Sequence, residues 1–421
     1  MIEIPGNTKD HRTLPRLPHI SLVERDRRWQ RVRRKMDERG LDCLAVVVIG
    51  HSSDMSNMAY LSSIHFPGAG GALLVFPRNH EPTVHMGGNL ANLEMWRHTQ
   101  EWVKEIRPAP QPLSWPRATM DRLRELGLSK SRVGVVNQAD APGVDCSLAE
   151  FFAHRARDIM PDVAWEDAGG LIEEVRLIKS DEEIALMQKA TEIGDQAILK
   201  TAEFAKAGIP SRAVYARLYA SLVECGSEHP FILWDAGPSP VHGVWVPDGH
   251  ILEPGHIILN EYSAYYYLYQ SQFQRPMAVG FVPDTYKRLF DAARASYERG
   301  FETLKPGNTF GNVVQAMAEP VLAAGFITVT PHFHGMGLSL ERPIAFSQKR
   351  RSLYQDLDTA RWHQFQNDME QLAVQPGMTI TFEPNAVTPD QKQGVHVGDT
   401  LVVREKGAER MSKLPLEWFI V

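Results

Sequence analysis

The sequence predicts two domains, an α/β domain at the N-terminus and a larger α+β domain at the C-terminus. The chain has 421 residues, which is long for one hydrophobic core. Its first part alternates apolar runs with helical patterns, whereas its second part combines long helices with a pattern of paired strands. We therefore predict an arm over residues 1–18, a first domain over 19–170 and a second domain over 171–421.

The composition limits the class of partner. Hydrophobic residues make up 43% and charged residues 23% of the chain, and the net charge is -6. These values are ordinary for a globular protein, and they argue against binding to nucleic acid or to an anionic membrane. The N-terminal residues contain no apolar run of the kind found in a signal peptide, and no segment is apolar enough to span a membrane. We expect a cytoplasmic protein with a small-molecule or peptide substrate.

The first domain begins with a helix and continues as a mixed sheet with helices. Ser21 and Glu24 have the spacing of a capping box, and the helix that they begin is expected to end at Gly40. The other predicted elements are strands at 41–50, 70–77, 81–86 and 131–136, and a helix at 120–127.

The second domain is predicted to contain four main helices. Ser180 and Glu183 form a second capping-box pattern, and the helix that follows is expected to end at Gly208. The other helices are predicted at 211–226, from 284 to about 304, and after 308 with an interruption near Pro320. Because these helices alternate with hairpin patterns, we expect an antiparallel sheet with helices on its outer face.

A hairpin is predicted at 255–280, around which the second domain is organised. Two apolar runs flank the small residues Ser263 and Ala264. On the return strand, the period of two places Gln270, Gln272 and Gln274 on one face. A solvated face is the ordinary explanation for such a row, and a binding face is the alternative.

Four segments of the second domain together resemble a known family. They are the hairpin, PHFHGMGLSLERP at 331–343, TFEPNAV at 381–387 and GVHVGDTLVV at 394–403. They are similar to the site segments of the pita-bread (M24 peptidase-like) family, which includes aminopeptidase P, prolidase, methionine aminopeptidase and creatinase. The resemblance implies a creatinase-like α/β N-terminal domain, a pita-bread α+β C-terminal domain and a homodimer.

The resemblance also places five metal-ligand positions on this chain, at Glu261, Gln272, His334, Glu383 and Gly398. An amide is a weak neutral donor and glycine has no side chain, so the site has two negative charges fewer than the family's metallopeptidases. We therefore expect no metal cofactor, with a single divalent ion at Glu261, His334 and Glu383 as the alternative.

The catalytic residues expected from the resemblance are His242, His334 and Glu383. His242 lies in GPSPVHGVW, where relatives have a working histidine, and either histidine could shuttle the proton. The residues expected to bind the substrate are Glu261, Gln272, Tyr265 and His396.

Creatinase lacks most of the metal ligands and breaks a C–N bond with a histidine and carboxylates, so the resemblance implies a similar reaction here. We predict a hydrolase that cleaves a C–N bond, of amide or amidine type, in a small molecule, with one metal ion or none. The alternatives are a lyase, an Xaa-Pro-type metallopeptidase with a divergent site, and a non-catalytic peptide-binding module. The long polar segment 341–375 is expected either to cover the site or to form a surface excursion.

Overall fold

The computed structural model describes residues 20–50, 55–64, 70–87, 90–109, 114–136, 147–242, 247–346 and 359–421. The predicted arm over 1–18 and the middle of the segment 341–375 lie outside these residues. The chain divides into two compact units, Met1–Arg176 and Leu177–Val421. Within the described residues, no helix is both long enough and apolar enough to cross a membrane.

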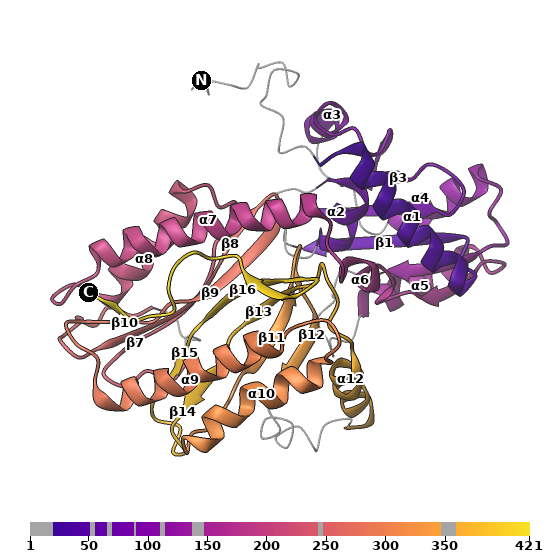
Figure 1. The fold of residues 1–421 in the computed structure, drawn as a ribbon. Helices are drawn as coiled ribbons and strands as arrows, with labels where there is room; N and C mark the ends of the chain where they lie inside the picture. The colour runs from indigo at the N-terminus through magenta and orange to yellow at the C-terminus, as the bar shows by residue number, and fades with distance from the viewer. Residues whose placement is uncertain are drawn as a thin grey trace, which may run out of the picture. The chain divides into compact units, whose positions relative to one another are not determined.

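The first unit is a mixed sheet with helices (Figure 1). Its strands lie in the order β4-β3-β2-β1-β5-β6, and β1 pairs antiparallel with β2 and parallel with β5. The strands are β1 (Cys43–Gly50), β2 (Gly70–Pro77), β3 (Thr83–Met86), β4 (Glu105–Pro108), β5 (Arg132–Val136) and β6 (Ala164–Asp167). The helices are α1 (Leu22–Arg39), α2 (Ser56–Ser62), α3 (Leu90–Thr99), α4 (Trp115–Glu125), α5 (Ser147–Ile159) and α6 (Leu171–Arg176).

Local signals explain the ends of α1. The Ser21 hydroxyl accepts a hydrogen bond from the Glu24 amide at 3.0 Å, which caps one of the unpaired N–H groups of the first turn. At the other end, Gly40 has a φ of 67°, a left-handed conformation that glycine adopts at little cost. Both predicted ends of this helix are therefore confirmed.

The second unit contains a ten-stranded sheet with helices along it (Figure 1). The order of its main path is β12-β11-β13-β16-β9-β8-β10-β18, and β7 pairs with β8 and β17 with β16. Its strands are β7 (Phe231–Gly237), β8 (Ile257–Tyr266), β9 (Tyr269–Gln274), β10 (Met277–Ala278), β11 (Pro331–Met336), β12 (Leu340–Phe346), β13 (Thr379–Phe382), β16 (Gly398–Arg404), β17 (Gly407–Arg410) and β18 (Phe419–Ile420), and β14 (Asn385–Val387) and β15 (Gly394–His396) form a separate pair. The helices are α7 (Asp181–Phe204), α8 (Ser211–Glu224), α9 (Asp284–Thr303), α10 (Phe310–Ala323) and α12 (Thr359–Gln371).

Two predicted helix details in this unit are wrong. Helix α7 begins with the predicted capping box at Ser180 and Glu183, but it ends at Phe204, four residues before Gly208. Helix α10 runs through Pro320 without interruption. Pro320 has no N–H to donate to the carbonyl four residues before it, so the helix continues with one backbone hydrogen bond fewer, and the Ala324 amide still donates to the Pro320 carbonyl at 3.1 Å.

The turn of the central hairpin lies further along the chain than the small residues Ser263 and Ala264 suggest. Both of those residues are inside β8, and the turn is at Tyr267 and Leu268, which have φ values of 54° and 64°. Neither residue type favours this conformation. The carboxylate of Glu228 accepts hydrogen bonds from both amides, at 2.8 and 3.0 Å, and holds the turn in place.

Candidate functional site

One face of the second sheet carries the candidate site. Five consecutive neighbours in this sheet, β11, β13, β16, β9 and β8, present polar residues to the same face, because alternate residues of a strand share a face. The pairs His334–Thr381, Thr381–Thr400, Gly398–Gln274 and Glu261–Gln274 fix their register. We call this set the polar face, and it consists of Glu261, Ser263, Gln272, Gln274, His332, His334, Thr381, Glu383, Gly398 and Thr400.

The polar face is buried. The glutamines of the return strand therefore do not lie on a solvent-exposed face. Gln270, Gln272 and Gln274 are 6%, 4% and 0% exposed. Residues between them along the strands, such as Phe273 and Phe382, point to the opposite face and belong to the apolar clusters that include residues of α7 and α10. Buried amides require hydrogen-bonding partners, so this face is suited to recognising polar groups.

Glu261 and Gln272 are joined on the polar face. The Gln272 side-chain amide donates to Oε1 of Glu261 at 2.5 Å, and the Gln272 backbone amide donates to the Thr400 hydroxyl at 3.0 Å. Burial raises the pKa of the Glu261 carboxyl to about 7, and the hydrogen bond from Gln272 opposes part of this rise. Among the described residues, Glu261 has no ion pair with a lysine or an arginine.

His334 and Glu383 form a second pair. Nδ1 of His334 lies 3.0 Å from the Gly335 carbonyl, which can only accept, so a neutral ring carries its proton on Nδ1 and a lone pair on Nε2. That Nε2 is 3.9 Å from Oε2 of Glu383. Burial lowers the pKa of His334 to about 4, although the bond to Gly335 favours the protonated ring. The imidazole is therefore neutral at neutral pH, with an unprotonated Nε2.

A third group brings together His242, Glu261 and His396. One potential ligand atom from each lies within 4.8 Å of the other two. The rings of His242 and His396 meet edge to face, with their centroids 5.0 Å apart. Burial lowers the pKa of His396 well below its ordinary value, and the neighbouring His242 lowers it further.

Gly398 occupies the last of the five positions that the resemblance assigns to metal ligands. A Cβ added there would overlap the carbonyl oxygen of Phe382 and would lie 2.8 Å from Oε1 of Gln274. The Gln274 side chain thus lies beside this position and also next to the Glu261 carboxylate, whose pKa it helps to lower. No side chain larger than hydrogen fits at 398 with this backbone.

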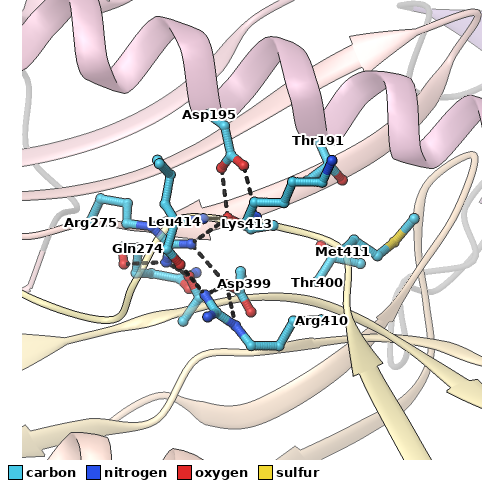
Figure 2. A network of polar contacts seen from close by, with 12 residues as sticks. Thr191, Asp195, Gln274, Arg275, Asp399, Thr400, Arg410, Met411, Lys413 and Leu414 are labelled. Atoms are coloured by element: carbon cyan, nitrogen blue, oxygen red, sulfur yellow. Dashed lines mark hydrogen bonds and ion pairs between the residues drawn. The ribbon is translucent and has the colours of Figure 1, made fainter.

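A buried ionic network fixes the backbone next to Gly398 (Figure 2). Arg275 donates to the carbonyl of Gly398 at 2.5 Å and to the carboxylate of Asp399 at 2.8 Å, and both charged side chains are fully buried. Arg410 and the hydroxyl of Tyr297 also donate to Asp399. Burial acts to raise the pKa of Asp399, but the charges of Arg275 and Arg410 outweigh it and hold the pKa below its ordinary value. The network holds β9 and β16 together behind the polar face.

The structure thus groups most of the predicted site residues. His334 lies with Glu383, Gln272 lies with Glu261, and His242 and His396 lie with Glu261. Tyr265 follows Ser263 on the same face of β8 and is half-buried, and burial raises its pKa to about 12. Residues that the sequence reasoning missed are Thr381 and Thr400, whose hydroxyls are 3.0 Å apart, and the pair Arg275 and Asp399. The period of two from Glu383 and Gly398 would have indicated the two threonines.

Two family models match most of the chain. Residues 185–405 match the model of metallopeptidase family M24, and residues 28–178 match the creatinase/prolidase N-terminal domain. The chain is 24% identical to the Xaa-Pro dipeptidase of Pyrococcus furiosus over 287 residues, which is 67% of this chain and 76% of that protein. It is 22% identical to the ectoine hydrolase of Halomonas elongata over 96% of this chain and 98% of that protein. The solved structure of an Xaa-Pro dipeptidase from Bacillus anthracis has a TM-score of 0.73 and 20% identity, and covers 94% of this chain and 100% of that one.

Proposed function

The chain belongs to metallopeptidase family M24, with a creatinase-like N-terminal domain and a pita-bread C-terminal domain, and we propose that it hydrolyses a C–N bond of a small molecule. The predicted fold class and the resemblance to this family are confirmed. Hydrolysis is the reaction of the relatives described above. The bond, of amide or amidine type, and the small size of the substrate are our proposal.

The family's dinuclear metal centre does not fit this chain. Gln272 offers a neutral amide and donates its N–H to Glu261, and Gly398 offers no side chain and has no room for one. Two divalent cations need a larger negative charge than the remaining carboxylates provide. The proposed reaction therefore uses side chains alone.

The pair formed by His334 and Glu383 carries the proposal. In the proposed reaction, a water molecule donates a proton to Nε2 of His334 as its oxygen attacks the carbon of the C–N bond. The carboxylate of Glu383, 3.9 Å away, stabilises the imidazolium that forms. His334 then donates the proton to the leaving nitrogen, so that the bond breaks and the ring returns to its neutral form. His242, the other candidate for this role, lies with Glu261 and His396 instead.

The polar face supports binding of a compact polar substrate. The buried amides of Gln272 and Gln274 offer donors and acceptors, and Tyr265 adds an aromatic ring at the half-buried end of β8. The similarity to the ectoine hydrolase extends over nearly the whole of both chains, whereas that to the Xaa-Pro dipeptidase covers a smaller part. The full-length match to the ectoine hydrolase supports a small-molecule substrate, and the equally long structural match to an Xaa-Pro dipeptidase supports the second candidate described next.

An Xaa-Pro dipeptidase activity is the second candidate, because Xaa-Pro dipeptidases recur among the similar proteins and structures. Purified protein incubated with Xaa-Pro dipeptides and, separately, with small amides and amidines such as ectoine distinguishes the two by mass spectrometry. Hydrolysis yields products whose summed mass exceeds that of the substrate by one water, whereas a lyase leaves the sum unchanged. We expect turnover of a non-peptide compound. Cleavage of dipeptides alone would contradict the proposal.

We also propose that the chain forms a homodimer, as the resemblance implies. Light scattering at micromolar concentration is expected to give twice the monomer mass. A fully active monomer would contradict the proposal.

A further inference from the structure

We propose that His242, Glu261 and His396 form a binding site for one divalent transition-metal ion, with a ligand set in which only Glu261 holds one of the family's ligand positions. The three potential ligand atoms lie within 4.8 Å of one another. Ligands of one ion, at the usual distances of about 2.0–2.2 Å, are separated by roughly 3–4 Å, so only a small closing movement is required.

The donor types select the class of ion. Two imidazole nitrogens with one carboxylate oxygen is a ligand set of catalytic zinc sites, which leave a further position open for water or substrate. Imidazole favours Zn²⁺ and its first-row neighbours over Mg²⁺ and Ca²⁺, which prefer oxygen ligands. The expected occupant is therefore an ion such as Zn²⁺.

His396 supplies an independent observation. Its side chain is 1% exposed, and neither ring nitrogen has a hydrogen-bond partner among the described residues. A buried ring that lacks both bonds is unfavourable unless a ligand completes it. A carboxylate oxygen of Glu261 lies within 4.8 Å of a ring nitrogen of His396, so the carboxylate is available to the same ion.

The backbone holds the two histidines close together. The amide of Gly394, at the start of β15, donates to the carbonyl of Pro240 at 3.1 Å, and the hydroxyl of Tyr286 donates to the same carbonyl at 2.6 Å. A Cβ at Gly394 would overlap the carbonyl of Val241. A glycine at 394 therefore permits the close approach that sets His396 beside His242.

This site differs from the single-ion alternative at Glu261, His334 and Glu383. In that alternative His334 is a metal ligand. In the site proposed here His334 is not a ligand, and its Nε2 stays available to accept the proton of the attacking water. Only Glu261 is shared, so variants of the other residues separate the two sites.

Zinc binding measured without substrate tests the proposal. Full-length protein is stripped with a chelator, dialysed and titrated with Zn²⁺ alone by calorimetry, and its metal content is determined by mass spectrometry. We expect about one ion per chain. His242→Ala and His396→Gln should each weaken binding by roughly tenfold or more, while His334→Gln and Glu383→Gln should bind as the parent does. Cobalt loaded in place of zinc should give a visible absorption band that is lost in His396→Gln.

Three results would overturn the proposal. These are the absence of stoichiometric zinc, two ions per chain, or binding that survives His396→Gln but is lost in His334→Gln. His242 lies outside the regular strands and is half-buried, so His242→Ala keeps the test valid if the buried His396 variant does not fold. If the metal-free protein still hydrolyses its substrate, the proposed function stands and the reaction does not need the metal ion.

Discussion

The carbonyl oxygen of Phe382 occupies the space that a side chain at Gly398 would need. Phe382 pairs with Asp399 in neighbouring strands, and Arg275 holds the Gly398 carbonyl from behind. A single backbone arrangement thus leaves no room for a side chain at the position that the resemblance assigns to the last metal ligand, and Gln274 lies beside it.

Restoring the family's ligands is therefore expected to fail. Gly398→Ala should lower the free energy of unfolding by roughly 1–3 kcal/mol, because the added methyl overlaps a backbone atom that cannot easily move. Gly249→Ala is a matched control, since the nearest atom to its added Cβ is 4.0 Å away, and it should have little effect. Chemical denaturation measures both.

The double variant Gln272→Asp, Gly398→Glu should not bind two metal ions, and a fully loaded, stable double variant would contradict this reasoning.

His334→Gln is expected to lower kcat by about 10²–10⁴-fold and to change KM much less, because the amide cannot take up the proton. Glu383→Gln should also lower kcat, since it removes the carboxylate that stabilises the imidazolium of His334. His256→Gln, the same change at the start of the hairpin, is the control and should retain turnover. Steady-state kinetics on the identified substrate provides the measurement. Near-normal kcat in His334→Gln would show that another group shuttles the proton.

Asp399→Asn should destabilise the protein by about 3–5 kcal/mol, because it leaves the buried charge of Arg275 without its carboxylate. Glu409→Gln breaks the exposed ion pair with Arg404 and should change stability by less than about 1 kcal/mol. Urea denaturation of the two variants gives the comparison. Equal, small effects would mean that the network in Figure 2 contributes little to stability.

His85 in the first unit is expected to make stability depend on pH. Burial, followed by the charge of Arg107, lowers its pKa to about 4 in the folded chain. In the unfolded chain the ordinary value is about 6.5, so between these values the unfolded state binds more protons. This contribution to stability is complete above about pH 6.5 and is lost as the pH falls towards 4, by about 2 kcal/mol between pH 7 and pH 5.

The variant His85→Gln cannot titrate and isolates this effect. Stability is measured by denaturation at pH 7 and pH 5 for both proteins, and the difference between their pH dependences reports on His85. The parent should lose more stability than the variant. A larger loss in the variant would reverse the expected sign.

Local patterns in the sequence determined much of the fold. The capping residues Ser21 and Ser180 mark helix starts, and Gly40 marks a helix end, because each acts on backbone groups within a few residues. The period of two on the return strand correctly placed the glutamines on one face. The segments that resemble the family contain Glu261, Gln272, His334 and Glu383, and the structure places Gln272 beside Glu261 and His334 beside Glu383.

Tertiary structure alone decided the remaining features, since they depend on contacts between residues far apart in the chain. Glu228 places the hairpin turn at Tyr267 and Leu268, although neither residue favours a left-handed conformation. His396 joins His242 and Glu261 because Gly394 packs against the segment that ends at His242, a contact that spans about 150 residues of sequence. Strands that are far apart in the sequence pair so that Thr381 lies opposite Thr400 and Gly398 opposite Gln274. This register determines which of the buried polar side chains can act on the same atom.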